Sequence, residues 1–354
     1  MIYLLAAILI FGLLIAVHEF GHFITAKAFN VIVNEFSIGM GPAIFQRKRG
    51  ETEYSLRVLP LGGYCALEDE EGVSDDPRGL GAQSFWKKIV IFAAGAVMNF
   101  ITGFVIICVL YAGARGFYTA EITELHPDFP QQGEQGVMVG DVIHRINGER
   151  IYMQSDVQLV MNCVPFDENG TMEMELLRGG EKLTRTLTLQ TYTNEEGEEY
   201  RAYGFTYGGL VEATPLNRLQ YSWYSTVDLA RMVKLSLQML IGGRAGVDDL
   251  AGPVGIVSTI TQVGEESETA ADAAYSIAYF AALIAVNLAV MNLLPLPALD
   301  GGKIFFLVIN TVSFRLFKKK IPEKYENYIH FVGFALLMLL LVAVTFNDIS
   351  RLVS

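Results

Sequence analysis

Four long apolar stretches organise the chain. They cover roughly residues 2–26, 89–112, 275–294 and 329–346. A helix needs about 20 apolar residues, rising 1.5 Å each, to cross roughly 30 Å of hydrocarbon, and each stretch is about that long. The pattern therefore predicts a polytopic α-helical membrane protein with four transmembrane helices.

The first stretch has an alternative interpretation as a cleaved signal peptide. Ala26-Lys27-Ala28 imitates a small-residue cleavage site. No basic region precedes the stretch, however, and His18 and Glu19 interrupt it. These features favour a retained transmembrane helix.

The distribution of Lys and Arg predicts the orientation in the membrane. The connections 27–88 and 303–327 carry eight and six of them, whereas the much longer segment 113–274 carries eleven against 24 Asp and Glu. Cytoplasmic loops are enriched in Lys and Arg. We therefore expect both basic connections in the cytoplasm and segment 113–274 outside the cell membrane.

Segment 218–241 is the one region that could change the number of crossings. Its stripe of polar positions at helical spacing includes three charged residues, Arg218, Asp228 and Arg231. That pattern favours an amphipathic helix in the membrane interface over a fifth span.

Residues 117–212 have the pattern of a β-rich module. Asn147-Gly148 is a strong hairpin signal, and residues 171–177 alternate between apolar and polar positions before the turn at Arg178-Gly179-Gly180. His126 and His144 have no evident partners in this module and are interpreted as surface residues.

The amino-acid composition excludes several classes of function. Only 18% of residues are charged, compared with about 25% in soluble domains. The net charge of −12 argues against nucleic acid as a partner, and the three cysteines form no CxxC pair that would indicate a thiolate zinc site or a disulfide framework.

The first apolar stretch contains His18-Glu19-Phe20-Gly21-His22, an H-E-x-x-H pattern. Residues i and i+4 project from one helix face, so both imidazoles can bind one Zn²⁺, and Glu19 lies beside them as a general base. The alternative is a pair of histidines that snorkel to the membrane surface. It leaves the Glu19 carboxylate unexplained at a costly depth.

A catalytic zinc site has three protein ligands and one open position. His18 lies near the cytoplasmic end of the first span, and Asp300 follows the third span on the same side. We therefore expect Asp300 to be the third ligand. Asp348 falls at the outer end of the fourth span, and Glu35 is a weaker candidate on a loop.

Pro295 and Pro297 precede Asp300 and predict a break in the helix. Broken backbone at membrane depth is tolerated where it is buried in protein or lines a water-filled cavity, which a hydrolase in a bilayer needs. An ordinary helix end followed by an Asp-Gly-Gly turn is the simpler alternative.

Several motifs occur in an order that resembles the site-2 protease family of intramembrane zinc metalloproteases, closest to the bacterial regulator-of-sigma-E protease branch. They are His18–His22, Gly39-Met-Gly41, Pro60-Leu-Gly-Gly-Tyr64, Ala94-Gly-Ala-Val-Met-Asn-Phe100, Gly252-Pro-Val-Gly255, Asn292–Gly302 and Phe346-Asn-Asp348. The resemblance runs almost end to end.

The resemblance implies His18, His22 and Asp300 as zinc ligands, Glu19 as general base, and Asn292 as a residue that helps to hold the substrate. It also implies a multi-pass protein of the bacterial inner membrane, with the active site near the cytoplasmic side and transmembrane segments of other proteins as substrates, such as anti-sigma factors or remnant signal peptides.

The same resemblance implies that the β-rich module is an extracytoplasmic PDZ domain. Several members of the branch carry two such domains in tandem, and this chain has room for one. The expected division is a first membrane half at 1–112, the PDZ domain at 117–212, an interfacial amphipathic helix and linker at 213–274, and a second membrane half at 275–354.

The loop 34–64 predicts a β-hairpin, with extended segments at 35–38 and 53–59. An exposed strand edge can bind an unwound substrate segment through its backbone, and we expect Gly39, Gly41, Pro295 and Pro297 to contribute to substrate binding. A plain cytoplasmic hairpin is the alternative.

Two other functions remain open from the sequence. A non-catalytic membrane adaptor would act through the PDZ domain and would not depend on His22 or Asp300. A metal or proton transporter would also have broken helices and buried charges, but the two halves of the chain show no matching interrupted segments. His330 opens the fourth span and is interpreted as interfacial rather than as a ligand.

Overall fold

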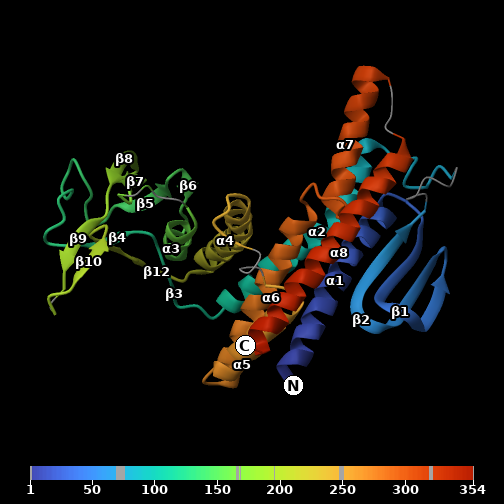
Figure 1. The fold of residues 1–354 in the computed structure, drawn as a ribbon, viewed down its shortest axis with the longest axis horizontal. Helices are drawn as coiled ribbons and strands as arrows, with labels where there is room; N and C mark the ends of the chain where they lie inside the picture. The colour runs from blue at the N-terminus through green and yellow to red at the C-terminus, as the bar shows by residue number, and fades with distance from the viewer. Residues whose placement is uncertain are drawn as a thin grey trace. The chain divides into compact units, whose positions relative to one another are not determined.

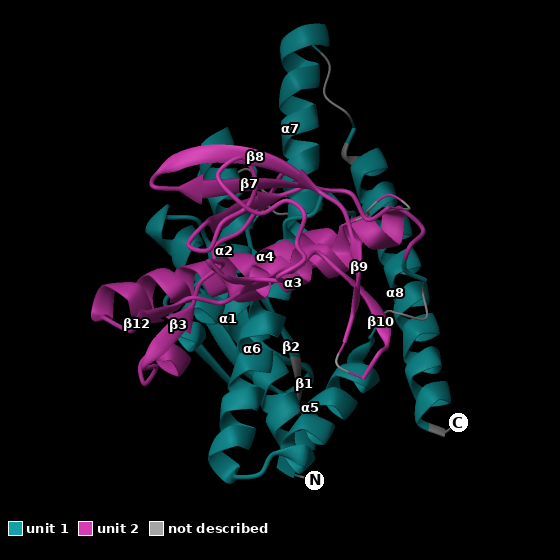
Figure 2. Cartoon of the chain, turned by 90° about the vertical axis from the view of Figure 1, so that its left-hand side faces the viewer, with its two compact units in different colours: residues 1–107, 245–354 teal, residues 108–244 magenta. Residues whose placement is uncertain are grey.

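The computed structural model describes residues 2–68, 76–164, 167, 169–194, 196–246, 251–318 and 322–353. The chain forms two compact units, which Figure 2 shows in separate colours. The helical unit comprises residues 1–107 and 245–354, and the β-rich unit comprises residues 108–244. Figure 1 shows the elements of each unit.

Six helices lie wholly or mainly in the helical unit: α1 (Ile2–Ala28), α2 (Phe85–Tyr111), α5 (Pro253–Glu266), α6 (Ala270–Asn292), α7 (Asp300–Phe317) and α8 (Glu323–Val353). Within the described residues, four helices are long and apolar enough to cross a membrane: Ile2–Ala28, Phe85–Tyr111, Ala270–Asn292 and Lys324–Leu352. They cover the four stretches that the sequence predicts as spans.

Helix α1 has two different faces, although most of its residues are apolar. Leu5, Leu9 and Leu13 recur every four residues and are more than half exposed. Ala7 and Leu14 are buried, and the two histidines of α1 continue that buried side toward the end of the helix. In a bilayer the leucine face contacts lipid, so the polar side chains of α1 are directed into the protein.

Two helices of this unit correct the sequence interpretation. Residues 253–266 were expected to be linker, and they form α5. Residues 303–317 were expected to belong to a cytoplasmic loop, and they lie in α7. Both helices are shorter than the four candidate spans and are not among them, so hydropathy did not separate them from their surroundings.

Asp348 of α8 fixes the beginning of α5. Its carboxylate accepts the backbone N–H groups of Gly252 and Gly255, and the side chain is only 3% exposed. These N–H groups belong to the first turn of a helix, where no intrahelical acceptor exists. Asp348 is thus a helix cap supplied from a distant part of the chain.

The predicted hairpin is present and is longer than expected. Strands β1 (Val33–Arg49) and β2 (Thr52–Leu67) pair antiparallel, and Glu35–Ile38 lie opposite Ala66–Gly63 and also beside Glu53–Leu56. This part of β1 therefore lies between two parts of β2. Both long strands bend to allow it.

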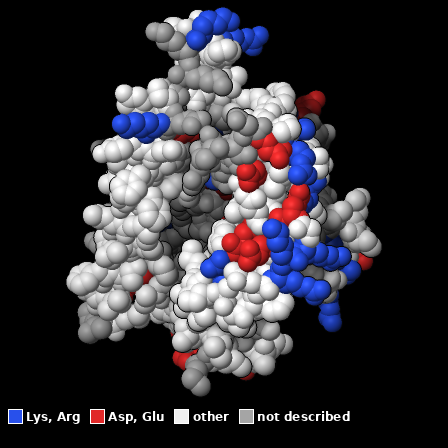
Figure 3. Space-filling view, turned by 90° about the vertical axis from the view of Figure 1, so that its right-hand side faces the viewer, with Lys and Arg blue, Asp and Glu red and all other residues white. Residues whose placement is uncertain are grey.

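Charged side chains of the helical unit gather around the hairpin. Arg57 donates hydrogen bonds to Glu35 and Ser37, and Glu51 pairs with Lys27 and Arg78. Figure 3 shows charged side chains concentrated in one region of a face that is otherwise largely uncharged. An uncharged surface of this extent is expected for helices that contact lipid.

The β-rich unit is built from short strands and two helices. The strands are β3 (Gly116–Tyr118), β4 (Ile122–Leu125), β5 (Val142–Ile146), β6 (Glu149–Arg150), β7 (Met172–Arg178), β8 (Glu181–Leu187), β9 (Gln190–Thr193), β10 (Glu199–Ala202), β11 (Phe205–Tyr207) and β12 (Leu210–Glu212), with helices α3 (Gln154–Cys163) and α4 (Pro215–Ile241). Strands β6, β5, β7 and β8 form one sheet in that order, and the pairs β4–β11, β3–β12 and β9–β10 complete the unit.

The alternation at residues 171–177 produces the core of this unit. Met172, Met174 and Leu176 on β7 are fully buried, whereas Glu173 and Glu175 between them face outward. Ile143 and Ile146 of β5 and Val157 and Val160 of α3 belong to the same cluster. The prediction of β-strands at these positions is confirmed.

Helix α4 matches the segment that the sequence predicts as amphipathic, and it is not among the four candidate spans. Its polar stripe is buried: Ser222, Asp228 and Arg231 are less than 9% exposed, while Leu216 and Trp223 are 73% and 47% exposed. Arg231 forms ion pairs with Asp228 and with Asp156 of α3. Part of the polar face of α4 thus packs within the β-rich unit.

Candidate metal centre

Helix α1 carries the two histidines on one buried face. The Nε2 atoms of His18 and His22 lie 3.2 Å apart, because one helical turn and 40° separate the two positions. Both residues are at most 9% exposed. Two imidazoles with adjacent nitrogen atoms and almost no access to water form the beginning of a metal site.

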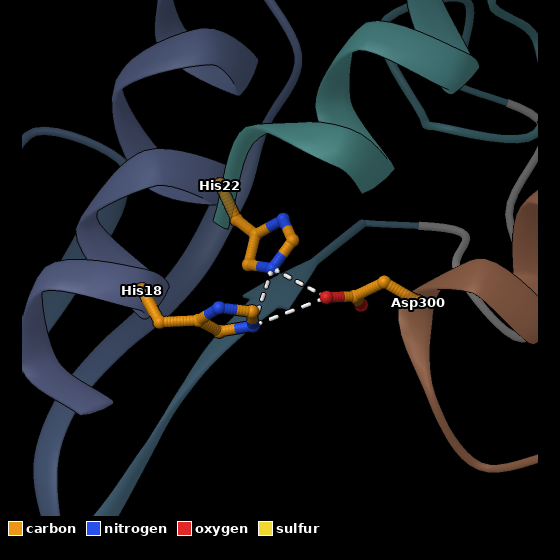
Figure 4. Close-up of side chains that lie close together, drawn as sticks. All are labelled: His18, His22 and Asp300. Carbon is orange, nitrogen blue, oxygen red and sulfur yellow. Dashed lines mark hydrogen bonds and ion pairs between the residues drawn. The ribbon is translucent and has the colours of Figure 1, made fainter. Parts of the chain in front are cut away.

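Asp300 joins them from the other end of the chain. It is the first residue of α7, and its Oδ2 lies 3.1 Å from Nε2 of His18 and 3.3 Å from Nε2 of His22 (Figure 4). One ligand atom from each of the three residues lies within 4.8 Å of the others. In the part of the chain that the structure describes, this is the only such group of three or more His, Cys, Asp or Glu residues.

Helix α2 orients His22. The carbonyl oxygen of Ile91 lies 2.8 Å from Nδ1 of His22 and accepts its proton, which leaves the lone pair of Nε2 for a ligand. Gly95, one turn further along α2, packs directly against both rings, because an added Cβ would lie 2.5 Å from Nε2 of His22. Sequence reasoning missed both contacts. A backbone carbonyl leaves no signal in the sequence, and Gly95 stood in a motif without an assigned role.

The donor set fits a divalent metal ion. Two imidazole nitrogens and one carboxylate oxygen are a ligand combination found in catalytic zinc sites. The buried Oδ2 of Asp300 has no conventional hydrogen-bond donor among the described residues, although it faces both Nε2 atoms. A buried carboxylate directed at two ring nitrogens is explained by an ion between them.

Glu19 lies next to this group. Its neighbours His18, His22 and Asp300 are all within electrostatic reach of its carboxylate. The Cγ atom of Glu19 also approaches β2, because a Cβ added at Gly63 would be 3.4 Å from it. Glu19 therefore lies between the candidate ligands and the hairpin.

The backbone is broken before Asp300, where the two prolines predict it. Helix α6 ends at Asn292, residues 293–299 are turns and bends that contain Pro295 and Pro297, and α7 then begins. Asn292 is partly buried at the end of α6. The roles of these three residues in substrate binding stay predictions.

Gly39 and Gly41 lie in β1 with positive φ angles of 87° and 85°, at the bend of the hairpin. Neither belongs to the group of candidate ligands. The two weaker candidates for the third ligand have other partners: Glu35 accepts hydrogen bonds from Ser55 and Arg57, and Asp348 caps α5.

Comparison with known proteins agrees with this geometry. The family model "Peptidase family M50" matches residues 6–340. The chain is 37% identical over 348 residues to a Clostridium perfringens protein named "Putative zinc metalloprotease CPE1693", with 98% of each chain covered. It is 28% identical to "Regulator of sigma-W protease RasP" of Bacillus subtilis, again with 98% of each chain covered.

Apolar helices that bring two buried histidines and a partly buried aspartate together define the protein as a membrane metalloenzyme. The chain belongs to peptidase family M50, so it is a protease. This membership confirms the resemblance to site-2 proteases that the order of motifs indicated.

Proposed function

We propose that this protein is a zinc endopeptidase that cleaves transmembrane segments of other membrane proteins. The observation that carries the proposal is the convergence of His18, His22 and Asp300 from the two ends of the chain, with Glu19 beside them. Relatives named zinc metalloproteases support zinc as the ion. A zinc ion held by these three residues would polarise a water molecule and the carbonyl group of the peptide.

Glu19 supplies the proton transfers in this proposal. Its carboxylate takes a proton from the attacking water as the new C–O bond forms, and it returns that proton to the leaving nitrogen as the C–N bond breaks. The products are a carboxylic acid and an amine. Ile91 holds His22 in the tautomer that leaves Nε2 free, and Asp300 brings negative charge that favours binding of a cation.

Substrate access follows from the hairpin. A transmembrane helix satisfies its own backbone hydrogen bonds, so a segment must be unwound before a peptide bond can be hydrolysed. Among the described strands, Gly63–Leu67 of β2 pair with β1 along one side only, and Gly63 lies against Glu19. An extended substrate segment can add to that edge, with Gly39, Gly41, Asn292, Pro295 and Pro297 as candidate contacts.

The placement in a cell is part of the proposal. The basic connections 27–88 and 303–327 would lie in the cytoplasm, the active site near the cytoplasmic side, and the β-rich unit outside the inner membrane of a bacterium. The β-rich unit is proposed to be a single PDZ domain that controls substrate entry. Anti-sigma factors and remnant signal peptides are the proposed substrates.

The decisive experiment compares Glu19→Gln with the wild-type protein in detergent or liposomes. Zinc content is measured beside cleavage of a transmembrane substrate. We expect Glu19→Gln to keep its zinc and to lose cleavage by 10²-fold or more, as for the loss of a general base. Retained zinc with unchanged cleavage would remove Glu19 from the mechanism.

Asp300→Ala separates the enzyme from the adaptor and the transporter. We expect this variant to lose both zinc and cleavage. An adaptor would keep its full cellular effect in Asp300→Ala. A transporter would show metal or proton flux in liposomes for the wild-type protein and none for the variant.

A further inference from the structure

The segment 293–299, which presents Asp300, is held by a residue of α8 with no assigned role. The backbone N–H of Ala298 donates a hydrogen bond to Nδ1 of His330 at 2.9 Å. Ala298 is two residues before Asp300, and His330 is 32 residues further along the chain. Neither the ligand group nor the motifs of the sequence include His330.

Ala298 has an unfavourable backbone conformation. Its φ angle is 70°, in the left-handed region, where a residue with a Cβ is destabilised by roughly 1–2 kcal/mol. Such a conformation persists only where surrounding contacts impose it, and it is often found at functional sites. The hydrogen bond to His330 is a specific contact that stabilises it.

The neighbouring contacts come from the same face of α8. Gly333, one turn after His330, packs so closely against Pro297 that an added Cβ would overlap with the proline ring. The ring of His330 also lies 5.1 Å from the ring of Phe306 on α7, and its Cε1 atom would be 3.3 Å from a Cβ added at Gly302. His330 therefore contacts both the segment before Asp300 and the helix after it.

His330 acts as a hydrogen-bond acceptor toward the backbone N–H of Ala298. Nδ1 accepts a backbone N–H, so it carries no proton, and a neutral ring then has its proton on Nε2. An Asn side chain can place its Oδ1 close to the position of Nδ1, whereas the amide of Gln extends to the position of Nε2. The two substitutions therefore separate the hydrogen bond from the bulk of the side chain.

We propose that His330, supported by Gly333, is a positioning residue that sets the place of Asp300 relative to His18 and His22. The inference rests on the proposed function, because it assigns Asp300 to a metal. A displacement of the segment 293–299 would move one of three ligand atoms that now lie within 4.8 Å of each other. The position of α8 thereby becomes a determinant of metal affinity.

The experiment measures metal binding by the full-length protein in detergent. The variants are His330→Asn, His330→Gln and His330→Ala, with Phe331→Ala as the control, since Phe331 is adjacent on α8 and 68% exposed. The readouts are the zinc Kd by chelator competition, the absorption spectrum of the Co²⁺-substituted protein, and kcat and KM for a transmembrane substrate.

We expect His330→Gln and His330→Ala to weaken zinc binding by about 10-fold or more, as for other groups that orient metal ligands, and to change the Co²⁺ spectrum. His330→Asn should stay within about threefold of the wild-type Kd, and Phe331→Ala should match the wild type. In His330→Gln saturated with zinc, kcat should fall because Asp300 is displaced, and KM should rise as well because Pro295 and Pro297 of the same segment are candidate substrate contacts.

Two results would overturn the inference. One is a zinc Kd and a Co²⁺ spectrum of His330→Ala that equal those of the wild type. The other is equal loss of affinity in His330→Asn and His330→Gln, which would mean that the hydrogen bond has no special role. A wild-type protein that binds no zinc and cleaves nothing would instead reject the proposed function itself.

Discussion

Gly95 gives the sharpest test of how the helices build the metal centre. In Gly95→Ala, the new Cβ would lie 2.5 Å from Nε2 of His22 and 2.7 Å from Nε2 of His18. Non-bonded heavy atoms are at their optimal separation near 3.5–4.0 Å. Helix α2 must therefore move away from α1 by roughly 1 Å, or the imidazoles must rotate away from Asp300.

Either response disturbs the orientation of His22. The carbonyl of Ile91 is on the same helix one turn earlier, at 2.8 Å from Nδ1 of His22, so a shift of roughly 1 Å brings this hydrogen bond beyond the normal range. Loss of a group that orients a metal ligand typically weakens metal affinity 10- to 100-fold. Overpacking of this kind also destabilises the fold by roughly 1–3 kcal/mol.

Gly103 provides a matched control on the same helix. A Cβ added there would lie 2.6 Å from Val286 of α6, so Gly103→Ala overpacks α2 to a similar degree at a distance from the histidines. Zinc Kd values from chelator competition are compared with thermal unfolding for both variants. We expect both to lose stability and only Gly95→Ala to lose zinc affinity.

The reasoning would be refuted by a Gly95→Ala protein that binds zinc as tightly as the wild type. It would also be refuted if Gly103→Ala weakened zinc binding to the same extent. In that case general loosening of the helices, rather than contact with the imidazoles, would explain the effect.

Three further outcomes are expected. Asp348→Ala leaves the N–H groups of the first turn of α5 without their acceptor, which costs about 1–3 kcal/mol per buried donor. Hydrogen exchange of these N–H groups should therefore accelerate in Asp348→Ala and accelerate less in Asp348→Asn. Unchanged exchange in Asp348→Ala would contradict the role of Asp348 as a helix cap. Met174→Ala opens a cavity in the β-rich core and should destabilise this unit by about 2–5 kcal/mol in a denaturant titration, whereas the exposed Val139→Ala should not. Burial, together with the charge of Asp156, raises the pKa of Asp228 to about 7, so the folded state binds this proton more tightly than the unfolded state. The stability of the β-rich unit should therefore fall as the pH rises from about 4 to about 7, and Asp228→Asn should remove that slope; equal slopes in the two proteins would be inconsistent with it.

The sequence predicted the parts of the structure that depend on local pattern. The four spans follow from runs of apolar residues, and the strand β7 follows from the alternation of polar and apolar residues that runs from Thr171 to Leu176. The hairpin of β1 and β2 was also predicted. The pairing of Glu35–Ile38 with two separate parts of β2 was not, because both parts can flank β1 only after β2 bends. Helices α5 and α7 were missed, since their residues have no strong local signal of their own.

In the candidate metal centre, too, local pattern predicted some features and tertiary packing decided the others. An H-E-x-x-H pattern on a helix places His18 and His22 together whatever the rest of the chain does, because helical geometry alone fixes two positions four residues apart. The choice of Asp300 as their partner came from the expected membrane topology, which can specify a level in the bilayer but not a distance. The structure supplies that distance, 3.1 Å to His18.

Only the tertiary structure decided which groups surround the candidate ligands. These groups act through contacts between parts of the chain that are far apart in sequence. They are the carbonyl of Ile91, the imidazole of His330, and Gly95, whose lack of a side chain lets α2 approach the two histidines. Local sequence encodes the shape of each helix, and the apolar character of the spans encodes their burial in lipid. The contacts that hold the Asp300 carboxylate against two imidazoles form only when the helices pack. Each of these contacts depends on the distance between the backbones of two helices, and the sequence of one helix alone does not determine that distance.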